Sequence, residues 1–563
     1  MTSKPSSPTW RQKAAKKKER DLAKIPNEWR LPPITIDQAK TRCSIADDFI
    51  DSLLDPKTTH ITNLDLPILM QMTRSGSLSA VELVTAFCKR AAYGHQLNDN
   101  LLEIGFQQAI EKAKSLDYQR ALKQPVGPLH GLPITVKDQF YVKGMETSMA
   151  YVGWIDTFEG DRSSPRKDNV ESEIIRELES LGAIVIAKST LVQTLGAIET
   201  NNNILGYNQN PRNQLLSSGG SSGGEGAVQA LRGSAIGIGS DIGGSISIPA
   251  AFNGVYSIKP SVGRLSFMNV ADSSPGQSII PTVPGIIGSS VASLEYLLKS
   301  LISTQPWLHD SDVLPLPWRE QDDVLNDSHL SFGLMEFDGV VRPHPPIQRA
   351  LNMVAKALST SGHELIQWDP PAHTTALEIH KKNEITCANG GYDIFERLAL
   401  SGEPLIPEMR SSFPDAKATT PLDAIQIEKA VIRLRAYKAE YHKYWMSTAK
   451  NTITGRPVDA IILPVWPSAA VEPGKPIYGG YIGFANVVDH STMVIPVTRA
   501  DMHIDKLDEA YNPVGEKDGE IWKSYDPKLY HGAPAAVQIQ CRRLEEEKLL
   551  SIGKILTSAL SEL

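Results

Sequence analysis

The stretch LLSSGGSSGGEGAVQALRGSAIGIGSDIGGSISIPAAF, residues 215–252, decides how this sequence is interpreted. Its first part, SSGGSSGGEG (217–226), has the composition of a flexible linker. A linker separates two self-contained patterns of secondary structure, whereas here a helix-like segment (226–233) and an apolar, strand-like segment (234–240) follow directly. The glycines and serines therefore lie inside one continuous pattern, and we interpret them as a loop within a folded domain.

Strand-like and helix-like segments alternate on both sides of this loop. Upstream, LPITVKDQF (132–140) and AIVIAK (183–188) are strand-like, and SEIIRELESLG (172–182) between them has helical periodicity. Downstream, HLSFGLME (329–336) and DAIILPVW (459–466) are again strand-like. This alternation predicts an α/β layer with a largely parallel sheet.

The N-terminal part, residues 1–59, is expected to form a helical arm. TWRQKAAKKKERDLAK (9–24) is typical of a polar, basic helix. Its apolar face is too thin for a membrane anchor. We expect Trp10 and Leu22 to pack this helix on the body of the protein, with its charged face in solvent.

Bulk properties exclude several classes of protein. A net charge of −7 over 563 residues gives no indication of nucleic-acid binding and argues against anionic membranes. The four cysteines are too far apart for a zinc site or a disulfide framework, and their scarcity fits a reducing compartment: Cys43, Cys88, Cys387 and Cys541. No signal-peptide pattern and no apolar run long enough to span a membrane is present, and the final Ser-Glu-Leu lacks the lysine of a peroxisomal address. We expect a cytoplasmic protein.

One interpretation of the glycine-rich loop is the nucleophile elbow of an α/β-hydrolase. GSSGG (220–224) fits G-x-S-x-G with Ser222 as the nucleophile, and the required partners could be Asp489, His490 or His531. However, no β-branched strand runs directly into the serine.

A second interpretation is a dinucleotide-binding loop. GIG (237–239) with Gly243 approaches the fingerprint of such loops, but Ile242 stands where a glycine is needed. Pro249 also interrupts the helix that should follow at once.

The third interpretation, which we favour, is acyl transfer by a serine without histidine. Ser245 would attack an amide carbonyl, and a lysine made neutral by burial would serve as the base. The glycines would let several backbone N–H groups face one oxyanion, and let a serine of GGSSGG lie between lysine and nucleophile.

Three motifs together resemble the amidase signature family, and the similarity is greatest to fungal acetamidase-like general amidases. They are GGSSGGEGA (219–227), SDIGGSISIPAAF (240–252) and GPLHGLPITVKDQF (127–140). The resemblance covers about residues 60–550. It implies one large α/β domain whose mixed central β-sheet is covered by helices on both faces.

The resemblance also implies a Ser-cisSer-Lys triad. Lys137 matches the catalytic base, Ser221 matches the bridging serine that follows a cis peptide bond, and Ser245 matches the nucleophile that carries the acyl group. The positions that match the backbone oxyanion hole are Ile242, Gly243, Gly244 and Ser245.

Residues around the triad are expected to support it and to line the pocket. Leu195 occupies a position that lines the acyl pocket in related amidases, and Asp241 and Ser222 are expected to support the catalytic loop. Ser247 stands where the signature usually has an arginine, so Asp241 is expected to lack its usual partner.

These features predict a hydrolase that cleaves a linear carboxylic amide through an acyl-serine, without a metal or an organic cofactor. The partner is a small-molecule amide, with no nucleic acid and no transmembrane segment, and a homodimer is left open. An amide-forming acyltransferase and a catalytically degenerate binding protein are the alternatives. We expect surface insertions near 303–328 and 402–420, and residues 551–563 to end a C-terminal helix.

Overall fold

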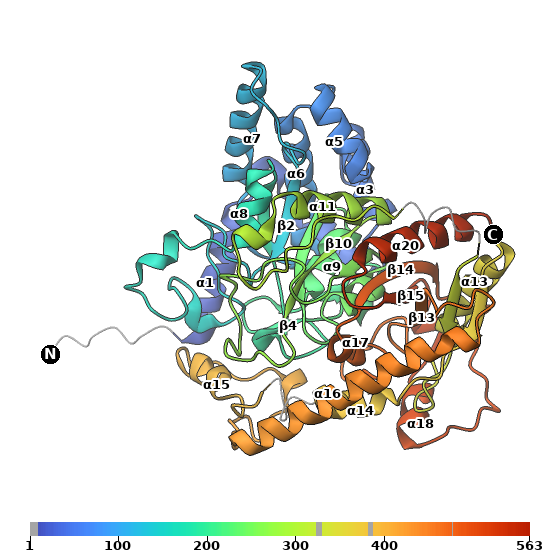
Figure 1. Ribbon diagram of the computed structural model, residues 1–563. Helices are drawn as coiled ribbons and strands as arrows, with labels where there is room; N and C mark the ends of the chain where they lie inside the picture. The colour runs from blue at the N-terminus through green and yellow to red at the C-terminus, as the bar shows by residue number, and fades with distance from the viewer. Residues whose placement is uncertain (1–8, 322–328, 381–386, 476) are drawn as a thin grey trace.

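The computed structural model describes residues 9–321, 329–380, 387–475 and 477–563. A mixed sheet of 11 strands, in the order β1-β3-β2-β8-β10-β9-β14-β15-β13-β11-β12, runs through the molecule between layers of helices (Figure 1). Its strands are β1 (Leu101–Ile104), β2 (Pro133–Lys137), β3 (Ile184–Ser189), β8 (Ile236–Asp241), β9 (Tyr256–Lys259), β10 (Val283–Gly288), β11 (Ser331–Leu334), β12 (Glu364–Gln367), β13 (Ala460–Pro464), β14 (Ser491–Arg499) and β15 (Pro534–Cys541). Two short hairpins pair β4 (Asn201–Asn202) with β5 (Gly206–Tyr207) and β6 (Gln209–Asn210) with β7 (Asn213–Ser217).

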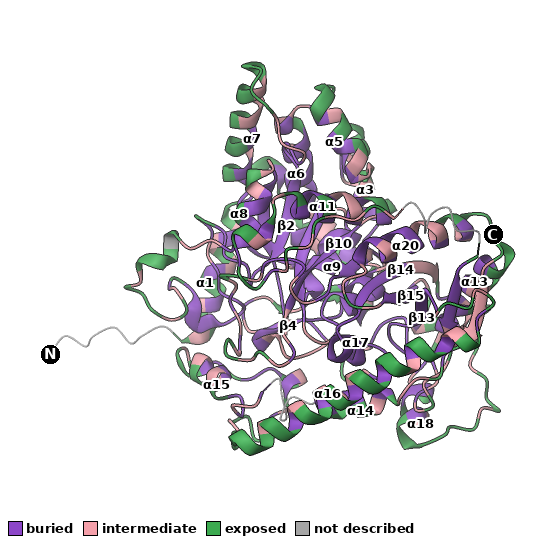
Figure 2. Cartoon of the chain, in the orientation of Figure 1, coloured by how far each residue is buried: buried purple, intermediate pink, exposed green. Residues whose placement is uncertain are grey.

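The helices of the first half are α1 (Trp10–Ala23), α2 (Pro33–Lys40), α3 (Asp48–Ser52), α4 (Pro56–Asn63), α5 (Leu66–Ser75), α6 (Ala80–Asn98), α7 (Phe106–Ala121), α8 (Glu173–Ser180), α9 (Gly223–Ala230), α10 (Ser247–Asn253) and α11 (Val291–Ser303). Those of the second half are α13 (Pro345–Thr360), α14 (His373–His380), α15 (Tyr392–Ala399), α16 (Ala424–Ser447), α17 (Gly483–Val488), α18 (Glu516–Lys523), α19 (Pro527–Tyr530) and α20 (Glu546–Ser561). Figure 2 shows buried central strands, with the exposed residues concentrated on outer helices such as α16.

The α/β class and the mixed sheet agree with the resemblance, but the prediction of a largely parallel sheet is wrong. Parallel pairing joins β2 to β3 and β8, and β11 to β12 and β13. Between these two groups, β10, β9, β14 and β15 pair only in the antiparallel sense. Antiparallel neighbours need no crossover helix. The alternation of helices and strands in the sequence therefore predicts the parallel groups correctly but does not predict the antiparallel strands in the middle of the sheet.

Two stretches, 303–328 and 402–420, are predicted as surface insertions, and the structure describes the second of them completely. Within 303–328, residues 322–328 lie outside the described part of the chain. In the segment 402–420, Met409 and Phe413 are fully buried in an apolar cluster.

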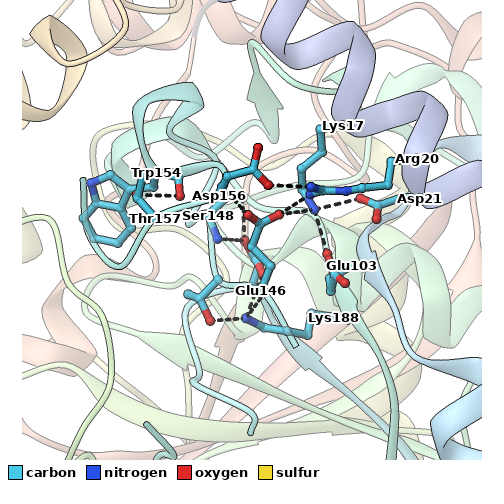
Figure 3. A network of polar contacts seen from close by, with 12 residues as sticks. Lys17, Arg20, Asp21, Glu103, Glu146, Ser148, Trp154, Asp156, Thr157 and Lys188 are labelled. Atoms are coloured by element: carbon cyan, nitrogen blue, oxygen red, sulfur yellow. Dashed lines mark hydrogen bonds and ion pairs between the residues drawn. The ribbon is translucent and has the colours of Figure 1, made fainter. Parts of the chain in front are cut away.

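Helix α1 is held on the body by apolar packing and by the ion pairs that Figure 3 shows. Trp10 and Leu22 pack against the core, as expected. Lys17, in contrast, is only 2% exposed, so the charged face of this helix is not entirely in solvent. Its ammonium lies 2.7 Å from Glu103 and 2.9 Å from Glu146. Burial lowers the pKa of Lys17, but these carboxylates outweigh burial and raise that pKa overall.

Replacing Lys17 with methionine is expected to destabilise the protein. The substitution leaves the carboxylates of buried Glu103 and half-buried Glu146 without their central cation, and loss of one partner from a buried ion pair costs about 3 kcal/mol. Urea denaturation checks this, with Lys16→Met as the matched control because Lys16 is exposed on the same helix. Equal midpoints for the two variants would show that the buried network contributes no stability.

No helix in the described residues combines the length and the apolar character needed to cross a membrane.

Candidate active site

Lys137 is the last residue of β2, a strand in which every residue is buried. The Lys137 side chain is fully buried as well. Its Nζ lies 2.8 Å from the Ser221 hydroxyl and 2.9 Å from the Ser240 hydroxyl. Because β2 lies in the interior of the sheet between β3 and β8, the amine points into the protein rather than into water.

Burial gives this lysine an unusual acidity. It lowers the pKa of Lys137 from 10.5 to about 7, and the attraction of Asp241, Asp272 and Glu225, which acts in the opposite direction, is smaller. A large fraction of the amine is therefore neutral at physiological pH and able to accept a proton.

The loop between β7 and α9 that carries Ser221 is tightly packed. The peptide bond between Gly220 and Ser221 is cis. Gly219 has φ +79°, a left-handed conformation that favours glycine. A Cβ on Gly220 would lie 2.9 Å from the carbonyl carbon of Ile198, so a larger residue does not fit. Ser221 itself is only 2% exposed, so the loop is buried at this position.

Ser245 lies in the loop between β8 and α10, next to the Ser221 loop. Its carbonyl accepts a hydrogen bond of 3.3 Å from the N–H of Ser222. Within the described residues, the hydroxyls of Ser221 and Ser245 are not hydrogen-bonded to each other. The structure thus brings Lys137 and Ser221 into direct contact and places Ser245 in the adjoining loop.

Asp241 organises the backbone of the Ser245 loop. It accepts hydrogen bonds from the N–H groups of Gly244 (2.8 Å) and Ile246 (2.6 Å). The side-chain amide of Asn486 donates a third bond of 3.0 Å. Asp241 therefore has a side-chain partner other than the arginine of the usual signature, because Asn486 of α17 (Gly483–Val488) donates to it.

The oxyanion donors expected from the resemblance are narrowed by this arrangement. The N–H of Gly244 already donates to Asp241. The N–H groups of Gly243 and Ser245 donate to no acceptor among the described residues. The buried hydroxyl of Ser247 also has no hydrogen-bond partner there. The N–H of Gly244 is thus engaged within the loop, whereas those of Ile242, Gly243 and Ser245 have no acceptor among the described residues.

Replacing Asn486 with alanine is expected to lower kcat about tenfold, because the Asp241 carboxylate loses a donor and the Ser245 loop shifts. KM should change much less, since Asn486 acts through Asp241. Steady-state kinetics checks this, with the exposed Asn451→Ala as control. An unchanged kcat in a folded Asn486→Ala variant would contradict the positioning role.

Two residues that sequence reasoning missed hold the lysine in place. The hydroxyl of Ser240 donates to the Gln139 side-chain carbonyl at 2.6 Å, and the Gln139 amide donates to the carbonyl of Ala271 at 2.7 Å. Both residues stand inside motifs already quoted, Ser240 next to Asp241 and Gln139 two positions after Lys137. That proximity was the only signal available.

His380 at the end of α14 was also missed. Its Nε2 donates to the carbonyl of Ile242 at 2.6 Å. A Cβ on Gly243 would lie 2.8 Å from the His380 ring, so glycine is needed there for this close approach. The two partners are 138 positions apart in the chain, and nothing local to His380 predicts the contact.

The loop that carries Leu195 lies beside the Ser221 loop. Leu195 is half-buried with φ +62°. The N–H of Val192 donates to the carbonyl of Ser221 at 3.3 Å, and Gln193 bonds to Glu403 at 3.0 Å. The segment 402–420 thus supports the loop that the resemblance assigns to the acyl pocket.

The two other interpretations of the glycine-rich stretch do not fit this geometry. The hydroxyl of Ser222 donates to the carbonyl of Ser240 at 3.3 Å rather than to a histidine. The proposed elbow partners Asp489, His490 and His531 bond instead to Arg543, Gln540 and Met502. Gly237 and Gly239 lie within β8, so they form no phosphate-binding loop.

Comparison with known proteins defines the class of the molecule. Residues 82–550 match the family model described as Amidase, and the chain belongs to this family. It is a hydrolase that acts on amide carbon–nitrogen bonds.

Individual relatives match over nearly the full length. The chain is 40% identical to an acetamidase of Aspergillus oryzae, over 97% of this chain and 98% of the relative. It is 38% identical to an acetamidase of Emericella nidulans, over 98% and 99%. A solved structure of a fatty acid amide hydrolase matches with a TM-score of 0.89 at 31% identity, covering 97% of this chain and 94% of the other.

Proposed function

We propose that this enzyme hydrolyses a linear carboxylic acid amide to the acid and an amine or ammonia, through an acyl intermediate on Ser245. The observation that carries the proposal is the contact of 2.8 Å between the Ser221 hydroxyl and the fully buried amine of Lys137. The names of the relatives, an acetamidase and a fatty acid amide hydrolase, support a linear amide substrate.

The proposed relay needs no metal or organic cofactor. Neutral Lys137 takes a proton from Ser221 as Ser221 takes one from Ser245, and the Ser245 oxygen forms a bond to the substrate carbonyl carbon. The carbonyl π electrons move to oxygen, where the N–H groups of Ile242, Gly243 and Ser245 stabilise the charge. This step requires the two serine hydroxyls to come within hydrogen-bonding distance when substrate binds.

The tetrahedral intermediate then collapses and releases the nitrogen. As the carbon–nitrogen bond breaks, the proton held by Lys137 returns through Ser221 to the leaving nitrogen. Water attacks the acyl-serine ester, gives a proton to the same relay and releases the carboxylic acid, and Ser245 regains its proton.

A panel of linear amides of increasing acyl length tests the proposal. Purified protein should release acid and ammonia or amine in equal amounts from at least one member. Added hydroxylamine should divert part of the product to hydroxamate, because it competes with water for the acyl-serine. If the amide is converted to hydroxamate when hydroxylamine is present, but is not hydrolysed when hydroxylamine is left out, the enzyme is an acyltransferase. Failure of every amide, together with no labelling by a serine-reactive probe, would indicate a degenerate binding protein.

A further inference from the structure

A cluster of two glutamates and a histidine lies away from the Lys137–Ser221 contact, where α8 meets the short helix η5 (Pro306–Leu308). Glu173 and Glu177 are four residues apart on α8 and share one face of that helix. His309 follows η5 directly. One ligand atom from each of the three side chains lies within 4.8 Å of the other two.

Glu177 is the unusual member of this cluster. The residue is 2% exposed, and neither of its carboxylate oxygens accepts a hydrogen bond from a described residue. A buried carboxylate without a partner is strongly disfavoured in its charged form. A bound cation or a proton would neutralise this carboxylate and remove the cost of burying its charge.

The distances within the cluster suit a shared metal ion better than direct bonds. The Nδ1 atom of His309 lies 3.6 Å from Glu173 Oε1 and 3.8 Å from Glu177 Oε1. Both separations exceed the roughly 2.7–3.2 Å of a hydrogen bond. Nitrogen and oxygen ligands at zinc-type bond lengths in a tetrahedron are about 3.3–3.6 Å apart. The separation from Glu173 reaches the upper end of this range, and the separation from Glu177 would have to shorten slightly when an ion binds.

We propose that Glu173, Glu177 and His309 bind a divalent transition-metal ion of the zinc type, which ties α8 to the segment after η5. Imidazole with two carboxylates favours such an ion over Mg²⁺ or Ca²⁺, which prefer oxygen ligands alone. Water would complete the coordination. Arg176 now contacts Glu173 Oε1 at 2.6 Å, but its side chain is 60% exposed and can move into solvent. The metal would stabilise the fold and take no part in amide hydrolysis.

Zinc binding to the full-length, untagged and chelator-treated protein tests this proposal. Isothermal titration should show one Zn²⁺ per chain, and Mg²⁺ should not compete. Zinc at a hundredfold excess over its Kd should raise Tm by about 2 °C for a chain of this length.

Two variants remove ligands in different ways. His309→Ala removes a side chain that is 39% exposed, and Glu177→Gln keeps the shape of a buried side chain while removing its charge. Each should weaken zinc binding at least tenfold. Glu179→Gln is the matched control on the same helix, because Glu179 pairs with Lys112, and it should bind zinc like the wild type.

The outcomes separate a built site from surface binding. Loss of binding in both ligand variants, with retention in the control, supports the site. The absence of zinc binding by the wild type overturns the proposal. Full zinc binding by the His309→Ala variant also overturns the proposal, because the ion then binds elsewhere on the protein.

Discussion

Replacing Ser245 with alanine is expected to lower kcat/KM for amide hydrolysis by about 10⁴-fold or more. In the proposed mechanism Ser245 is the only group that forms a bond to the substrate carbon. Ser221, whose hydroxyl contacts the Lys137 amine, passes protons in this mechanism and forms no bond to the substrate. Rates with an amide from the panel, before and after the substitution, measure the effect.

The matched control for this variant is Ser247→Ala. Ser247 lies two positions away, is fully buried, and its hydroxyl has no hydrogen-bond partner in the described residues. Its removal should leave kcat/KM within about threefold of the wild-type value. A fluorophosphonate probe should label the Ser247→Ala variant at Ser245 and leave the Ser245→Ala variant unlabelled. Substantial turnover by a folded Ser245→Ala variant would exclude the assigned nucleophile.

The contact between Lys137 and Ser221 could be anticipated because short motifs contain both residues. Lys137 ends an apolar run that predicts a buried strand, and the glycines around Ser221 and Ser245 predict loops that hold unusual backbone conformations. The structure places Lys137 and Ser221 in contact and makes the peptide bond before Ser221 cis. The hydrogen bond expected between the hydroxyls of Ser221 and Ser245 is not formed among the described residues.

Contacts between distant segments could not be anticipated in the same way. Asn486 replaces the missing arginine at Asp241 from 245 positions away, and His380 reaches the carbonyl of Ile242 from another helix. Lys17 lies in a basic run typical of a solvated helix face. Only the fold brings Glu103 to it. Side chains of this kind carry no local pattern, since their partners are set by tertiary packing.

The pH dependence of the reaction is expected to follow the charge of Lys137. The amine must be neutral to accept a proton, and burial lowers its pKa to about 7. The activity, measured as kcat/KM, should therefore rise with pH to a plateau, with its midpoint near pH 7. Two pH units below the midpoint only about 1% of the amine is neutral, so activity near pH 5 should be about a hundredfold lower than the plateau.

Lys137→Met tests the same group directly. Methionine has a similar length and fits an apolar environment, but its side chain accepts no proton between pH 5 and pH 9. The variant should lose about 10³-fold in kcat/KM, and its residual activity should not show the limb near pH 7. A wild-type profile that is flat from pH 5 to pH 9 would contradict a lysine base.

A second buried group titrates in the same range, so the midpoint alone does not identify the lysine. Burial raises the pKa of Glu225 to about 7, and its carboxylate accepts a hydrogen bond of 2.8 Å from Thr135, two positions before Lys137 on β2. Glu225→Gln separates the two groups. Because the Glu225 charge raises the pKa of Lys137, its removal should move the midpoint to lower pH and keep the limb. If Glu225 itself controlled activity, the same substitution would abolish the limb. The pH dependence would then report the charge of Glu225 and not that of Lys137.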